Sequence, residues 1–160
     1  MASTLKVKIE ENIILDNQDY GSKRVLEVGS IASIVKRIVN IGTNEIGLLG
    51  FGTAYNTELS KSYLAGQFDE DNVRYIRITN LDSTNHIALV LKNENNDEFG
   101  VKVDKGCSFL YCADLAGGVV DTMDSADAAG ITPNSFGDLV DITCAADTAA
   151  CDVEVFVAST

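Results

Sequence analysis

The 160-residue chain contains no tryptophan, one proline and one histidine. A nucleophilic site that relies on a histidine base could draw only on His86. This residue follows the polar turn DSTN at the start of an expected strand, where a partly exposed histidine is ordinary. We therefore predict no catalytic residue and no enzymatic activity.

Nucleotide-binding loops are also missing, because neither G-x-G-x-x-G nor G-x-x-x-x-G-K-[ST] occurs. The closest glycine-rich segment, GLLGFG, lacks the lysine and the following helix. We assign its glycines to a twisted strand or a bulge.

Basic residues are absent from the last third of the chain. All 12 lysines and arginines lie at or before Lys105, whereas residues 106–160 carry nine acidic residues and no histidine. The net charge of −12 disfavours binding to phosphate backbones, so we expect no nucleic-acid partner. The simpler interpretation of the acidic part is a solvated face, and the alternative is a surface for a basic protein or cations.

Long apolar runs are lacking too. No stretch of about 18 apolar residues is present, so we expect no membrane partner. The first residues, MASTLKVKIEENIIL, carry acids where a signal peptide needs an apolar centre, so we expect no cleaved leader.

The four cysteines form no C-x-x-C pair, which argues against a zinc site. Cys107 and Cys112 are five residues apart, and on one strand this spacing places them on opposite faces. We expect the thiols to be free and to serve as small core residues.

The other two cysteines flank AADTAA, which we interpret as the turn of a hairpin. Cys144 can pair with Cys151 only if the two are directly opposite, and that register sets Asp141 against Glu154. Moving Cys144 opposite Val153 removes the clash of like charges. The register disfavours the disulfide but leaves it open.

What the chain does have is alternation of apolar and polar residues, the pattern of half-buried antiparallel strands. It is clearest from Val73 to Ala158, in VRYIRITNL, HIALVLKN, FGVKVDKG, CSFLYCAD, LVDITCA and CDVEVFVAST, which are separated by turns such as DSTN and ENNDE. About eight to ten short strands predict an all-β fold, an antiparallel β-sandwich that is jelly-roll-like.

The N-terminal part is less regular. Residues 5–15 alternate well enough for a strand, DNQDYGS is a turn, and KRVLEVG is a second strand. Residues 31–41 fit a helix face or a strand, and dense β-branching favours a strand that forms a hairpin with IGLLGFGTA. We expect one sandwich domain over residues 1–160. Residues 1–30 have two alternatives, an N-terminal arm or an edge strand.

The longest predicted loop runs from Val119 to Gly137 and is rich in Asp, Ala and Gly. Long loops commonly carry contacts. Its members that we name as interface candidates are Val119, Asp121, Asp124, Ile131 and Phe136.

Carboxylates recur in this loop at every third position. Asp121, Asp124 and Asp127 are a weak calcium candidate, because the spacing D-x-D-x-D-G of an EF-hand is absent. A solvated or interface loop is the better interpretation, so we predict no metal and no cofactor.

A resemblance covers about Val35 to Ala158. The segments that carry it are RYIRITNLDSTNHIALVLKN, EFGVKVDKGCSFLY and, most distinctive, GDLVDITCAADTAACDVEVFVA. They resemble small all-β virion structural proteins of tailed bacteriophages, especially marine ones. The resemblance implies a non-enzymatic particle protein. Such a protein would be located in the virion, and in the host cytoplasm during assembly.

Within that class we favour a capsid decoration (cement) protein that stabilises the head, binds the major capsid protein and forms a homo-oligomer, a trimer being favoured. A neck, tail or fibre-associated accessory is the alternative. A carbohydrate- or receptor-binding sandwich is a further alternative of another class, weakened because tryptophan is absent and the tyrosines are scattered.

Overall fold

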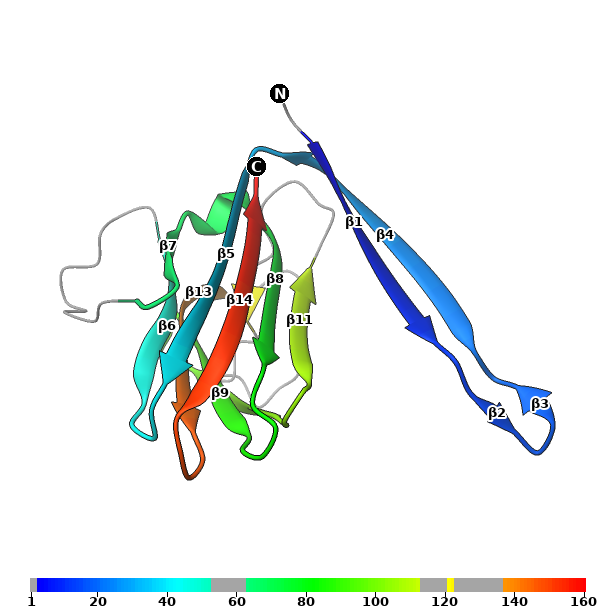
Figure 1. Ribbon diagram of the computed structural model, residues 1–160. Helices are drawn as coiled ribbons and strands as arrows, with labels where there is room; N and C mark the ends of the chain where they lie inside the picture. Colours follow the sequence, from blue (N-terminus) through cyan, green and yellow to red (C-terminus); the bar gives the residue numbers. More distant parts are fainter. Residues whose placement is uncertain (1–2, 53–62, 113–120, 123–136) are drawn as a thin grey trace, which may run out of the picture.

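The computed structural model describes residues 3–52, 63–112, 121–122 and 137–160, and these residues form two packed β-sheets with a long hairpin beside them (Figure 1). The only helix in these ranges is a single 3-10 turn, Glu70–Asn72. None of the described segments is a helix able to cross a bilayer. The predicted all-β class is confirmed.

The two sheets have the strand order of a jelly roll. One sheet has the order β11-β8-β14-β5, and the other has the order β10-β9-β13-β6 and is extended by β7 and by β12, which pairs with β13. The pairs are antiparallel except β6 with β7. The bounds are β5 (Ser33–Ile41), β6 (Ile46–Phe51), β7 (Gly66–Phe68), β8 (Val73–Asn80), β9 (Ile87–Asn93), β10 (Glu98–Val103), β11 (Ser108–Cys112), β12 (Asp121–Thr122), β13 (Gly137–Ala146) and β14 (Cys151–Ser159).

The core lies between the two sheets and is built by alternate residues of each strand. Every second residue of β14 from Cys151 to Val157 is buried there, and β8 and β9 contribute in the same way. These side chains are mostly Ile, Leu and Val, which favour strands and fill a layer of this kind. The alternation seen in the sequence is therefore the division between core and surface.

Two buried asparagines hold the turns that follow their strands. Asn80 donates from Nδ2 to the carbonyl oxygen of Asn85 at 2.9 Å. Asn93 accepts on Oδ1 from the backbone N–H groups of Asn95 (3.0 Å) and Asp97 (2.8 Å). Each buried amide thus satisfies chain groups that a turn leaves unpaired.

Two predicted hairpins are wrong. β5 and β6 follow each other across GTNE but belong to different sheets, and the same holds for β13 and β14 across AADTAA. Both connections cross from one sheet to the other, as the jelly-roll order requires. Neither register considered for Cys144 exists, because the neighbours of β14 are β5 and β8.

Two of the three glycines of GLLGFG, Gly47 and Gly50, lie in the strand β6 as predicted, and Gly52 follows it. Between β6 and β13 the register shifts, so that Leu48 forms a bulge between paired residues. A Cβ at Gly50 would overlap the ring of Tyr63, which lies directly against the backbone of this residue. Glycine at this position allows the ring to cover the sheet.

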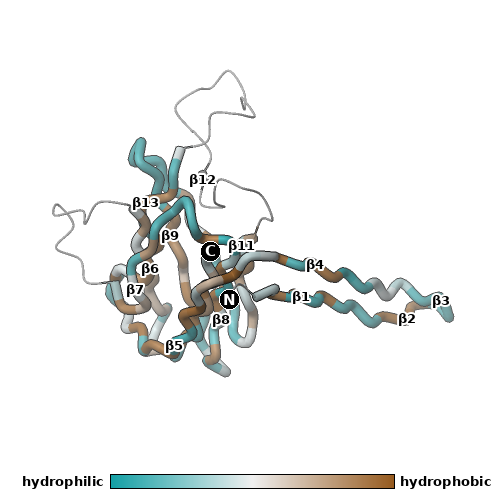
Figure 2. Tube along the Cα trace, turned by 90° about the horizontal axis from the view of Figure 1, so that it is seen from above, coloured by the Kyte–Doolittle hydropathy of each residue, from teal (hydrophilic) through white to brown (hydrophobic). Residues whose placement is uncertain are grey.

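A projecting hairpin is formed by β1 (Ser3–Glu11), β2 (Ile14–Leu15), β3 (Gln18–Asp19) and β4 (Ser22–Ile31). We call it the arm, and its end, residues 12–21, the tip. β1 pairs with β4 and β2 with β3, and in the described structure neither pair joins a sandwich sheet. Figures 1 and 2 show the arm leaving the sandwich near the C-terminus and extending away from it.

The strand predicted over residues 5–15 is interrupted after Glu11, and the predicted turn DNQDYGS contains β3. The turn proper is Asp16–Asn17, whose φ angles are 50° and 64°. Two positive φ angles in a two-residue loop are typical of a type I′ turn, and Asp and Asn tolerate them. The turn lets the chain reverse and continue into β4.

Most of the predicted interface loop lies outside the described residues. Val119, Asp124, Asp127, Ile131 and Phe136 fall there, and so do the interface and calcium interpretations that depend on them. Asp121 is placed in β12, where it lies opposite Asp138 of β13. The loop prediction is wrong for residues 121–122, because these residues form a strand.

Candidate interaction surface

The lone histidine lies at the turn end of the sandwich. Its Nδ1 is 3.4 Å from Oδ2 of Asp147, and both side chains are about one-third exposed or more. The carbonyl oxygen of His86 also accepts from the backbone N–H of Asp147. These contacts join the start of β9 to the crossover before β14.

Across the described ranges, no three side chains of His, Cys, Asp or Glu gather in a way that could hold a metal.

The outer face of β11-β8-β14-β5 has a charged centre. Glu154 of β14 receives Lys36 from β5 at 3.0 Å and Arg77 from β8 at 2.5 Å. The side chain of Glu154 is only 14% exposed. The hydrogen bond from Lys36, together with Arg77, lowers the pKa of this carboxyl below 4.5, although desolvation opposes the shift. This ion triad ties three neighbouring strands together.

Next to the ion triad lies an aromatic pair. Tyr75 and Phe156 meet edge to face, with ring centroids 5.8 Å apart and planes at 77°. The guanidinium carbon of Arg77 is 5.9 Å from the Phe156 centroid, within the range of a cation–π contact. Burial raises the pKa of Tyr75.

The base of the arm is fixed on this aromatic pair. Val28 and Ile31 of β4 are buried with Tyr75 and Ala158 in a second, smaller core. The hydrophobic residues packed against it are Leu5, Val7, Leu26 and Phe156. One backbone hydrogen bond, from Ala32 N to Ser159 O at 2.9 Å, continues the attachment into β5.

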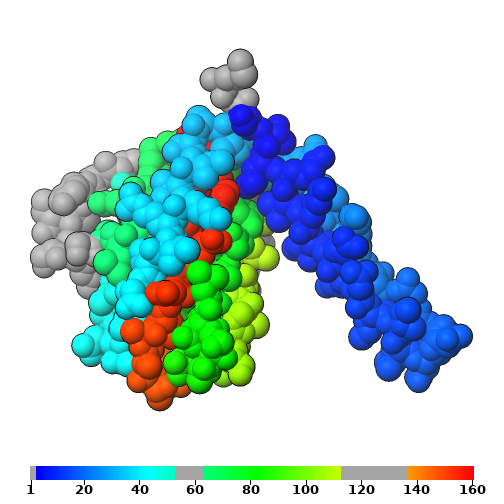
Figure 3. All heavy atoms as spheres, viewed as in Figure 1, coloured from blue at the N-terminus to red at the C-terminus, as the bar shows by residue number. Residues whose placement is uncertain are grey.

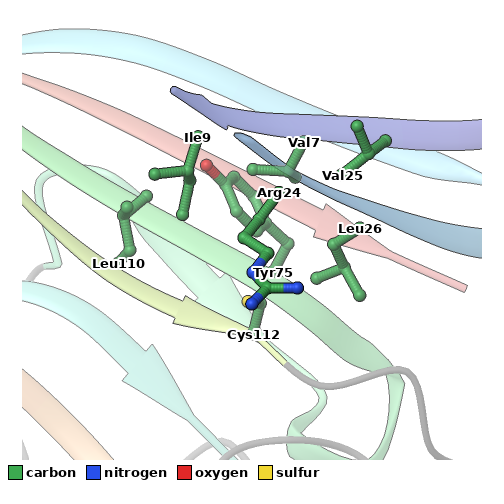
Figure 4. A pocket seen from close by; sticks show the side chains of 8 residues that line it. All are labelled: Val7, Ile9, Arg24, Val25, Leu26, Tyr75, Leu110 and Cys112. Carbon is green, nitrogen blue, oxygen red and sulfur yellow. The ribbon is translucent and has the colours of Figure 1, made fainter. Parts of the chain in front are cut away.

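Further along, the arm separates from the sheet and leaves an apolar hollow of about 110 Å³ (Figure 4). Val7 and Ile9 of β1 and Leu26 of β4 line one side, and Tyr75 and Leu110 line the other. The remaining lining residues are Arg24, Val25 and Cys112. The contact between arm and sandwich therefore ends about halfway along β1.

The outer half of the arm exposes large hydrophobic side chains. Ile14 is 76% exposed, and Leu15 and Tyr20 are each 58% exposed. Ile9, Ile13 and Val25 are exposed to about half of their surface. Glu10, Glu11, Asp16 and Asp19 are interspersed with them, and residues 10–20 contain no basic residue. The tip is thus both apolar and acidic.

A second exposed apolar strip lies on β5, which is an edge strand of the same sheet among the described strands. Ile34 and Ile38 are 56% and 62% exposed and flank Lys36 on the outer face. Arg37 is exposed too, but it lies opposite the core residue Val155 and therefore points to the other face of β5. Long edge strands with exposed hydrophobic residues invite pairing with another chain, and charges such as these limit it.

Neither surface was among the predicted interface candidates. A signal for the tip was present, because Ile13, Ile14 and Leu15 directly precede a polar turn and cannot all face one core. The exposure of Ile34 and Ile38 depends on β5 being an edge strand, which periodicity does not reveal.

Comparison with known proteins finds no matching family, no curated protein with a similar sequence and no solved structure with a similar fold.

Proposed function

We propose that the chain is a non-enzymatic structural protein of a tailed-phage particle, most specifically a decoration protein that stabilises the head and assembles as a homo-oligomer. The observation that carries this proposal is the arm, whose apolar tip extends beyond the sandwich. A long exposed hairpin of this kind is suited to contact a neighbouring chain.

Two further observations support the assignment. The segments that resemble phage particle proteins coincide with strands of the sandwich, from β5 to β14. The sandwich has jelly-roll topology, a fold used by viral capsid domains and also by lectins and cupins. The fold alone does not select among these roles, and the arm favours assembly.

A neck, tail or fibre-associated role would use the same arm, so location must be measured. The experiment is mass spectrometry of purified particles of the phage that encodes the chain, followed by labelling of the particle surface with an antibody against it. We expect many copies per particle, distributed over the head.

Head stability gives the second readout. Heads that lack the chain should release their DNA at a lower temperature, and adding the purified chain should restore resistance. Label confined to the tail or neck would replace the decoration role with the accessory role. Absence of the chain from particles would refute the proposal.

A further inference from the structure

We propose that the arm tip of one copy packs across the outer side of β5 in a second copy of the chain, so that copies join head to tail. The donor surface is the tip, residues 12–21. The acceptor surface consists of Ile34, Lys36 and Ile38. The inference rests on the self-association included in the proposed function and names the two surfaces that make it.

The tip needs a partner. A two-stranded hairpin is at best marginally stable alone in water, and only the base of the arm packs on the sandwich. Beyond the hollow, the arm exposes Ile14, Leu15 and Tyr20 for more than half of their surface. A protein surface that covers these side chains would stabilise the hairpin and remove apolar area from water.

The acceptor surface matches the tip in both polarity and charge. Ile34 and Ile38 offer exposed apolar area of the same kind. The tip carries two acids, Asp16 and Asp19, and no base, whereas the outer face of β5 carries Lys36 and no acid. Lys36 pairs with Glu154 at 3.0 Å, but its side chain stays 58% exposed and can still meet the acids of the tip. Charge complementarity of this sort selects and orients partners.

The molecule already contains a contact of this type with itself. The apolar face of the arm base lies on Tyr75, Phe156 and Ala158. In the same sheet Ala158 is directly opposite Ile34, and Phe156 is directly opposite Lys36. The face that accepts the arm base is therefore continuous with the acceptor surface on β5.

The arrangement of the two surfaces dictates how copies join. The arm passes over the side of the sheet formed by β8 and β11, and β5 is the opposite edge (Figures 1 and 3). One copy can therefore donate its tip and accept a neighbour's tip at the same time. Such a heterologous contact closes into a ring when the rotation between copies allows it, and a ring of three satisfies every tip.

The experiment measures the mass of the full chain by light scattering and sedimentation over a range of concentrations. The donor variant is Ile14→Lys and the acceptor variant is Ile38→Asp. The control is Phe99→Asp on β10, a strand of the other sheet, where the side chain is 46% exposed. We expect the wild type and the control to form the same oligomer, and both variants to associate at least roughly tenfold more weakly, since each places a charge in an apolar contact.

Mixing the two variants gives the decisive result. Ile14→Lys retains its acceptor surface and Ile38→Asp retains its tip, so an equimolar mixture should form a 1:1 heterodimer that neither variant forms alone. Circular dichroism monitors folding, and Ile14→Ser and Ile38→Ser replace any variant that unfolds. A monomeric wild type, an intact oligomer in either variant, or a mixture without heterodimer would overturn the inference.

This test is separate from that of the proposed function. If the chain oligomerises through the tip but is absent from particles, the inference stands and the phage role is refuted. If the chain is monomeric in solution but needs Ile14 to bind heads, the phage role stands. The partner of the tip is then a capsid protein and not a second copy of the chain.

Discussion

Cys144 and Cys151 are both completely buried, yet they belong to opposite sheets of the sandwich, Cys144 to β13 and Cys151 to β14. The short crossover between them carries the chain from one sheet to the other. Their thiols are buried as predicted, whereas Cys107 and Cys112 are exposed, so the prediction of core residues is wrong for that pair.

This division predicts two classes of thiol. In the native protein Cys107 should react fastest with a thiol reagent, Cys112 more slowly because burial raises its pKa, and Cys144 and Cys151 only after unfolding. Burial raises the pKa of Cys144 to about 12, so its reactive thiolate is scarce at neutral pH. The measurement is thiol titration without reductant before and after denaturation. Fewer than three reactive groups in the unfolded chain would reveal a disulfide.

The ion triad at Glu154 predicts a pH-dependent contribution to stability. Its pKa is lowered in the folded state, so the stabilisation is present above the ordinary value of 4.5 and is lost as the pH falls through the folded pKa. Glu154→Gln should lower the free energy of unfolding at pH 7 by about 1 kcal/mol. The difference from wild type should vanish in acid.

The matched control for Glu154 is Glu98→Gln. Glu98 pairs with Lys92 at 3.3 Å but is 54% exposed, so the expected loss is small. Thermal unfolding of both variants from pH 3 to pH 7 checks the comparison. Equal effects of the two substitutions at pH 7 would contradict a special role for Glu154.

Tyr75 should fix the base of the arm. Tyr75→Ala removes the ring that packs against Phe156 and beneath Val28, and we expect a loss of roughly 3 kcal/mol in unfolding free energy. Amide hydrogen exchange in β1 and β4 should accelerate. Tyr75→Phe retains the ring and should change both quantities little. Unchanged exchange in the alanine variant would show that the arm is fixed elsewhere.

The turn at Asp16–Asn17 should set the stability of the tip. Asn17→Gly preserves the positive φ of 64° without strain, whereas Asn17→Val places a β-branched residue in a region it avoids. We expect the valine variant to lose on the order of 1 kcal/mol locally and the glycine variant to lose nothing. Nuclear Overhauser contacts between Ile14 and Asp19, which are opposite each other, report the outcome.

The close approach at Gly50 gives a further prediction. Gly50→Ala would force Tyr63 away from β6, because the added Cβ overlaps its ring. We expect a loss of about 1–3 kcal/mol in unfolding free energy from overpacking. Gly42→Ala is the control, because nothing lies within 4 Å of a Cβ there. Urea unfolding of both variants decides the matter.

The sequence by itself determined where strands form and which residues face the core. Alternation located the strands from β8 to β14 except β12, and the buried positions of β14 are those that alternation assigned to one face. DSTN and ENNDE marked turns because Asn and Asp side chains satisfy backbone groups locally. These features are local, so a single strand and its flanking residues suffice to encode them.

Only the tertiary structure decided which strands are neighbours. Alternation states which face a side chain takes but not which strand lies beside it, so AADTAA looked like a hairpin turn although it crosses the sandwich. The exposure of Ile38 likewise depends on β5 being an edge strand, and the projection of Ile14 depends on the arm leaving the sandwich near Ser30, where φ is 61°. Strand partnership is set by packing among residues far apart in the chain, and a local pattern carries no record of it.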